Sequence, residues 1–193
     1  MKILVKEEWD QVIKEGTKRF SFDADLFRKR EEFRIGVSWH IPTDELVNAI
    51  KECSPMVSVA SGFAYTESLA IKEGADIIAT DICPNKDNQW CRDGIFHIQV
   101  EEISAVDAVK KYSGRNVFMA WPPYDKSMAF DVASEMDQER ILIYVGESQG
   151  GCTGNDDFFQ YLETHFEELD ISVDIPTWGG IYDDVHIYKK VKK

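Results

Sequence analysis

The chain has 193 residues, the length of one domain that can bury a core of its own. Its hydrophobic fraction of 44% and aromatic fraction of 12% are typical of a globular protein and exclude a disordered one. The 35 acidic and 22 basic residues give a formal charge of −13, and such a field repels nucleic acids and anionic membranes.

The first 40 residues differ in charge from the rest of the chain. They contain nine basic and eight acidic residues, so the acidity belongs to 41–193. Apolar residues around Trp9 form an amphipathic stretch. We therefore expect a helical or extended segment at 1–40 that packs on a domain at 41–193. The basic cluster from Arg28 to Arg34 is either an anion-binding surface or a solvated helix face.

No run of residues reaches the ~20 apolar positions that a membrane span needs, and the charged start MKILVKEEWDQ differs from a signal peptide. We expect a cytoplasmic protein without a membrane partner. The four cysteines are widely spaced and form no C-x-x-C pair, so reduced thiols are expected rather than a disulfide framework or a zinc site. The histidines show no metal-ligand spacing either, and no metal is expected.

From residue 41 onward, helical periodicity alternates with short apolar runs of strand length. A helix capped by Thr43 comes first. Strands are expected at 56–60, 76–81, 96–100, 116–121 and 140–146, with helices at about 65–73, 103–112, 126–137 and 156–168. Two further strands, at 169–176 and 185–191, have no helix between them and are expected to be antiparallel. The pattern predicts a three-layer α/β sandwich with a seven-stranded, mostly parallel sheet and a terminal antiparallel strand pair.

The turn after the first expected strand is rich in small residues. It reads Ala60-Ser61-Gly62-Phe63-Ala64, and small side chains let a backbone pass close to a ligand. In an open parallel sheet, ligands bind beyond the carboxyl ends of the strands, where the next helix offers free N–H groups. The spacing differs from the G-x-G-x-x-G of dinucleotide-binding proteins, so a dinucleotide is the weaker prediction. A plain tight turn is the alternative interpretation.

Asp81 ends the second expected strand, where an acidic side chain can accept hydrogen bonds from both hydroxyls of a ribose. With this residue, the chain from about Trp39 to Val191 resembles the class I, Rossmann-like S-adenosylmethionine-dependent methyltransferases. Their first motif is a strand, G-x-G-x-G, a helix, and an acidic residue that ends the second strand. Of the three glycines only Gly62 is present here, because alanines stand at positions 60 and 64.

The resemblance implies that S-adenosylmethionine is the cofactor. Ala60 to Ala64 would line its methionine end, Asp81 would hold its ribose, and Val100 with Glu101 would flank its adenine. The cofactor-binding residues expected on this basis are Ala60, Ser61, Gly62, Ala64, Tyr65, Asp81, Ile82, Val100, Glu101 and Trp121.

Trp121-Pro122-Pro123-Tyr124 follows the fourth expected strand, and its two prolines stiffen the turn. In methyltransferases that act on amino groups, the similar turn reads N-P-P-Y or D-P-P-Y. Its polar first residue and a proline carbonyl accept hydrogen bonds from the target nitrogen, and its ring stacks on a planar substrate. By this resemblance Pro122 and Tyr124 are candidate catalytic residues. Trp121 supplies no side-chain acceptor, which favours stacking on a planar or cationic group.

The loop after the fifth expected strand contains Gly146-Glu147-Ser148-Gln149-Gly150, which matches the G-x-S-x-G nucleophile elbow of hydrolases. A serine hydrolase that uses Ser148 and His186 is therefore a rival hypothesis. An elbow requires a helix directly after the serine, whereas the glycines from 150 to 154 predict a loop, and His186 lies inside an expected strand.

We therefore favour a loop that closes over the substrate, with Glu147 as the third candidate catalytic residue. Glu147, His40 and Asp125 are all candidate bases, and the sequence does not choose among them. The function expected is a methyltransferase with an unidentified acceptor, a small molecule or protein rather than a nucleic acid. A nucleic-acid target reached through the basic N-terminal segment stays open. A non-catalytic cofactor-binding protein of the same fold is a further alternative, suggested by Ala60, Ala64 and Trp121.

Overall fold

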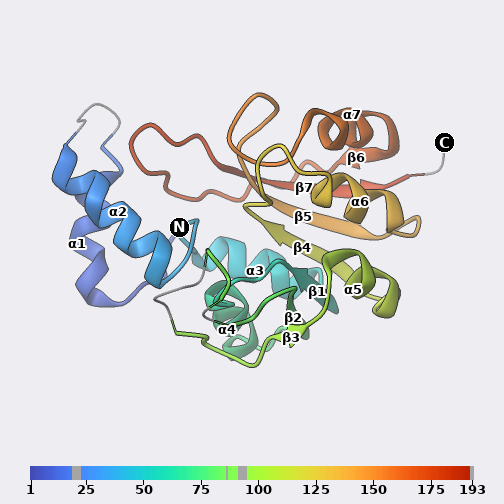
Figure 1. The fold of residues 1–193 in the computed structure, drawn as a ribbon, viewed down its shortest axis with the longest axis horizontal. Helices are drawn as coiled ribbons and strands as arrows, with labels where there is room; N and C mark the ends of the chain where they lie inside the picture. Colours follow the sequence, from blue (N-terminus) through green and yellow to red (C-terminus); the bar gives the residue numbers. More distant parts are fainter. Residues whose placement is uncertain (19–22, 86, 91–94, 192–193) are drawn as a thin grey trace.

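Seven strands form one sheet in the computed structural model, which describes residues 1–18, 23–85, 87–90 and 95–191 (Figure 1). The strands are β1 (Met56–Val59), β2 (Ile77–Asp81), β3 (Glu101–Glu102), β4 (Asn116–Ala120), β5 (Ile141–Gly146), β6 (Phe166–Glu168) and β7 (Asp184–Lys190). Their order in the sheet is β3-β2-β1-β4-β5-β7-β6. The first five are parallel, and β7 runs antiparallel to both β5 and β6. The predicted fold class is confirmed.

Helices cover both faces of this sheet (Figure 1). The helices of the described chain are α1 (Glu7–Gly16), α2 (Ala24–Gly36), α3 (Asp44–Glu52), α4 (Tyr65–Lys72), α5 (Ala105–Lys111), α6 (Met128–Glu135) and α7 (Asp156–His165), and α3 to α7 are the ones that cover the sheet. Because side chains alternate along a strand, Val57 and Val117 pack against α5, α6 and α7, whereas Met56 and Phe118 pack against α3 and α4. The Thr43 hydroxyl accepts a hydrogen bond from the Leu46 amide at 3.2 Å and caps α3 as predicted.

Two predicted strands lie elsewhere in the structure. The third strand is only Glu101–Glu102, not 96–100, and the predicted strand at 169–176 is extended chain outside the sheet. The alternation of apolar residues in 169–176 still reflects burial, because Val173 packs against the core. Side chains replace the missing ladder there: the Thr43 hydroxyl donates to the Asp174 carbonyl and Glu45 accepts from the Asp174 amide. The partner of β7 is instead β6, which forms at the end of the predicted helix 156–168.

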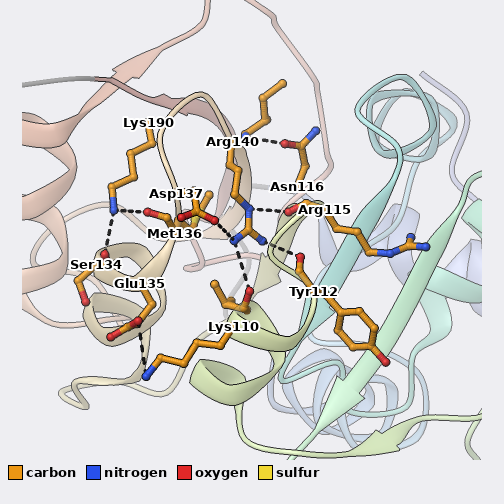
Figure 2. A network of polar contacts seen from close by, with 12 residues as sticks. Lys110, Tyr112, Arg115, Asn116, Ser134, Glu135, Met136, Asp137, Arg140 and Lys190 are labelled. Atoms are coloured by element: carbon orange, nitrogen blue, oxygen red, sulfur yellow. Dashed lines mark hydrogen bonds and ion pairs between the residues drawn. The ribbon is translucent and has the colours of Figure 1, made fainter.

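Two cations close the carboxyl ends of the helices beside the sheet (Figure 2). Arg140 donates to the Arg115, Tyr112 and Val109 carbonyls at 2.6, 3.3 and 3.4 Å, just beyond and within α5. Lys190 donates from Nζ to the Ala133, Ser134 and Met136 carbonyls at the end of α6. Helix ends leave carbonyls without intrahelical partners, so each cation satisfies several of them at once.

The N-terminal segment has a small apolar cluster of its own. Ile13 of α1 and Phe33 of α2 pack with Ile41 and Trp178, so the two helices lie against the loop that precedes β7 (Figure 1). The boundary at residue 40 stays a prediction. In the parts of the chain that the structure describes, no helix has the length and apolar character needed to cross a bilayer. Nor do three or more His, Cys, Asp or Glu side chains gather there to hold a metal ion.

Candidate functional site

A pocket of about 590 Å³ lies at the carboxyl ends of β1, β2 and β4. The order of the strands reverses between β1 and β4, so the loops that follow them leave in opposite directions and open a crevice. The volume falls in the range of small-molecule sites, about 300–1,000 Å³. The expected site residues that line it are Ala60, Ser61, Gly62, Tyr65, Asp81, Ile82, Trp121, Pro122 and Tyr124.

The turn between β1 and α4 adopts a glycine-like backbone. Ala60, Gly62 and Ala64 have φ angles of 52°, 53° and 55°, all in the left-handed region. For an alanine this conformation costs roughly 1–2 kcal/mol, since its Cβ crowds the carbonyl oxygen that follows. Ala64 is buried beneath the turn and does not line the pocket, but it is the N-cap of α4 and no side chain caps that end. The first amides of α4 can therefore receive an anionic group.

Asp81 connects this turn to the loop after β2. Its Oδ2 accepts a hydrogen bond from the Gly62 amide at 3.1 Å. Its Oδ1 accepts from the Cys83 amide at 3.0 Å and from the Asn88 side chain at 3.2 Å. A carboxylate has about four acceptor positions, so one position on Oδ2 is left for a ligand hydroxyl.

Glu67 is a buried acid in the wall of the pocket, 3% exposed, that the sequence analysis missed. Burial raises its pKa to about 7. The Ser58 hydroxyl donates to Glu67 Oε1 at 2.5 Å, and the Ser61 hydroxyl donates to Ser58 Oγ at 2.8 Å. Ser58 in the middle of a buried strand was the available signal, since a buried hydroxyl needs a polar partner.

His40 also lines the pocket, and its imidazole is hydrogen-bonded to the Thr66 hydroxyl at 2.9 Å. Burial lowers the pKa of His40 to about 4. The ring is therefore neutral at physiological pH. His40 can take part in hydrogen bonds there, but it carries no positive charge with which to bind an anion.

Three tryptophans from distant segments meet at the pocket. The ring centroid of Trp39 lies 5.2 Å from that of Trp121 and 5.6 Å from that of Trp90. The Trp121 indole N–H donates to Asp183 Oδ2 at 3.0 Å, and burial raises the pKa of Asp183 to about 6. Tyr124 completes the aromatic lining and is 65% exposed.

The turn at Trp121–Tyr124 is held by the loop after β5. The Pro122 carbonyl, the expected acceptor for a target nitrogen, already receives a hydrogen bond from the Gly154 amide at 3.3 Å. The Asp125 amide donates in turn to the Gly154 carbonyl at 2.8 Å. Pro122 and Tyr124 line the pocket as expected, but the Pro122 carbonyl helps to fix the turn.

Three other expected residues are absent from the described lining of the pocket: Val100, Glu101 and Glu147. Because β3 begins at Glu101, whereas the expected strand ended at residue 100, Cys83 and residues 87–90 form the wall instead. The Glu101 carboxylate accepts from Lys111 Nζ and the Tyr112 hydroxyl. Glu147 is buried and accepts from the Cys152 and Tyr182 amides at 2.6 and 2.9 Å, so it braces a loop rather than facing a substrate.

The rival hydrolase arrangement does not form. The first helix after Ser148 is α7, which begins at Asp156, so the strand–turn–helix of a nucleophile elbow is missing from this described part of the chain. His186 lies opposite Tyr144 in the antiparallel register, and its Nδ1 is 2.6 Å from Glu168 Oε1.

The basic cluster of α2 does not form an anion site. Its cations pair with acidic residues of the same helix: Arg28 with Asp25 and Glu32, Lys29 with Asp25, and both Arg30 and Arg34 with Glu31. These bonds favour the alternative interpretation, a helix face whose charges are internally balanced.

Neither a protein-family model nor a curated protein matches the sequence. Among solved structures, the chain is similar to magnesium protoporphyrin IX methyltransferase from Synechocystis PCC 6803 with bound S-adenosylmethionine. The TM-score is 0.51 at 10% identity, over 93% of this chain and 90% of that one. The same enzyme with bound S-adenosylhomocysteine gives 0.51 and 10% over 95% and 94%. A methyltransferase from Archaeoglobus fulgidus gives only 0.47, at 16% identity over 87% and 100%. At such low identity the likeness establishes the fold alone: the chain has the Rossmann-like fold of the Synechocystis enzyme.

Proposed function

We propose that the chain is an S-adenosylmethionine-dependent methyltransferase whose acceptor is a small molecule or protein rather than a nucleic acid. The observation that carries the proposal is the position of the pocket, beyond the carboxyl ends of β1, β2 and β4 where the strand order reverses. The similar Synechocystis enzyme, solved with bound S-adenosylmethionine and with bound S-adenosylhomocysteine, supports it.

The residues of the pocket fit this cofactor. The left-handed turn at Ala60 and Gly62 brings backbone to the pocket wall, and the uncapped start of α4 suits the carboxylate of the methionine end. Asp81 has an acceptor position left for a ribose hydroxyl. In the described lining two carboxylates, Asp81 and Asp87, are accompanied by no Lys or Arg, which suits a sulfonium cation.

S-adenosylmethionine supplies an electrophilic methyl group, and the protein's part is chiefly to hold the acceptor in line with it. The Trp121–Tyr124 turn is suited to this task because two prolines and the bonds to Gly154 fix its backbone. In place of the adenine contacts expected from Val100 and Glu101, we assign Ile82, Cys83 and residues 87–89.

Calorimetric titration of the protein and of an Asp81→Asn variant with S-adenosylmethionine tests the proposal. We expect binding to the unmodified protein and roughly tenfold or greater weakening in the variant, since a ribose hydroxyl loses its charged acceptor. Asp170→Asn, at an exposed carboxylate outside the described lining, is the matched control and should bind normally. Unchanged affinity in Asp81→Asn would refute the ribose assignment.

Asp81 also bonds to the turn, so a second variant separates binding from folding. Ile82 lines the pocket and is 70% exposed, and Ile82→Lys should therefore fold normally. The added positive charge should weaken the binding of the cationic S-adenosylmethionine more than the binding of S-adenosylhomocysteine, which has no sulfonium. Methyl transfer by the wild type to any acceptor then distinguishes an enzyme from the non-catalytic alternative.

A further inference from the structure

Four aromatic side chains from three separate segments line the pocket. Trp39 precedes α3, Trp90 lies in the loop after β2, and Trp121 and Tyr124 belong to the turn after β4. We propose that the methyl acceptor is a flat aromatic small molecule without an anionic group, held against these rings. The inference rests on the proposed methyltransferase function and names the substrate class of the same pocket.

The four rings present exposed apolar surface inside the pocket. Trp90 is 45% exposed and Tyr124 is 65% exposed, although both line the pocket. Large aromatic side chains that stay accessible inside a pocket are the usual means of binding a planar ligand by stacking. The Trp39 ring contacts both Trp90, edge to face, and Trp121, at a tilt of 31°, so the rings form one surface rather than isolated contacts.

Trp121 is held in place before any ligand arrives. Its φ of 51° is unusual for a bulky residue, and such strained positions are kept where surrounding contacts fix them, often at functional sites. Its indole N–H donates to the buried Asp183 carboxylate at 3.0 Å, which sets the orientation of the ring. The same carboxylate places negative charge behind the indole, which makes its face more attractive to neutral or cationic aromatic groups than to anions.

The charges around the rings exclude an anionic acceptor. Asp81 and Asp87 line the same pocket, and no Lys or Arg does so within the described lining. Arg34 lies against these rings, with its guanidinium carbon 4.4 Å above the Trp39 ring. Its Nε and Nη2 donate to the Glu31 carboxylate, with Nη2 at 2.6 Å, so Glu31 offsets its charge.

Calorimetric titrations of the protein saturated with S-adenosylhomocysteine test the inference, because the cofactor's adenine then occupies its own place. The probes are 6-hydroxyquinoline, which is flat and neutral, a quinoline carboxylate of the same ring size, and decahydro-2-naphthol, which is neutral and saturated. We expect the flat neutral probe to bind roughly tenfold or more tightly than either of the others. Equal affinities, preference for the carboxylate, or no binding of the flat probe at millimolar concentration would overturn the inference.

Variants locate the binding surface. Trp90→Leu and Tyr124→Leu should each lower the affinity for 6-hydroxyquinoline by roughly tenfold, the usual effect of removing one stacking ring. Both variants should leave the affinity for S-adenosylhomocysteine unchanged. Tyr182→Leu removes an aromatic ring that is 77% exposed outside the described lining and should change neither affinity. An unchanged quinoline affinity in both pocket variants would contradict the inference. If S-adenosylhomocysteine itself fails to bind, the proposed function fails, and this inference fails with it.

Discussion

Ala60 and Ala64 hold the left-handed conformation that glycine adopts without strain. Ala60→Gly should therefore raise the free energy of unfolding, by up to about 1 kcal/mol after the greater flexibility of unfolded glycine is subtracted. Chemical denaturation measures the difference. Ala49→Gly, inside α3, is the control and should lower the same quantity by about 1 kcal/mol. Equal losses in the two variants would show that the turn is not strained.

The buried Glu67 makes stability depend on pH. Its pKa is raised from 4.5 to about 7, so folding favours the protonated carboxyl. The stabilisation is complete below pH 4.5 and is lost as the pH rises through 7. In Glu67→Gln this contribution is absent, and the unfolding free energy of the wild type should fall relative to the variant by up to about 3 kcal/mol between pH 5 and pH 8. Urea denaturation at both pH values measures this, and parallel curves for the two proteins would contradict it.

At the scale of elements, Lys190 of β7 joins the sheet to the carboxyl end of α6. It is 7% exposed and donates to three carbonyls (Figure 2). Lys190→Met removes the donor and leaves these carbonyls without their hydrogen-bond partner. The free energy of unfolding should therefore fall by about 2–4 kcal/mol. The exposed neighbour Lys189, which pairs with Glu139, is the control, and Lys189→Met should have a much smaller effect on the same denaturation curve. Equal effects would mean that the carbonyls do not need Lys190.

The elements that the sequence predicts well are those whose pattern is decided locally. The central strands are buried on both faces, and Thr43 signals the start of α3 by its own hydroxyl. The two misplaced strands depend on partners far along the chain. Val173 shows the alternation of a strand, but whether its segment pairs with β7 is decided by side chains of α3 that occupy the Asp174 backbone.

The site follows the same division. Four of the expected residues lie at the end of a strand or just after it, so their position at the edge of the sheet follows from the strand pattern. They are Ala60, Gly62, Asp81 and Trp121, and all four line the pocket. Glu67 takes its role from burial and from Ser58, which only the packed structure reveals. Glu147 is absent from the described lining, and only the packed structure shows that its carboxylate accepts from the Cys152 amide and from the Tyr182 amide just before β7.

At the scale of the whole molecule, the charge of −13 agrees with a pocket lined by carboxylates. Most cations of α2 pair with acidic residues of their own helix, and the partly buried Arg30 also interacts with the carboxylates of Asp183 and Glu147. The N-terminal segment joins the site through Trp39 and His40, which line the pocket, and Trp39 contacts Trp90 of the loop after β2. The molecule therefore presents an acidic and aromatic site, suited to cationic or neutral ligands.

Thermal unfolding with and without S-adenosylhomocysteine tests the central claim most directly, because a ligand that binds only the folded protein stabilises it. At a concentration about 100 times its dissociation constant, the ligand should add about 2.7 kcal/mol and raise the Tm by roughly 5–10 °C. Homocysteine alone, which lacks the ribose and adenine, should leave the Tm unchanged. A Tm that does not move with millimolar S-adenosylhomocysteine would contradict the account.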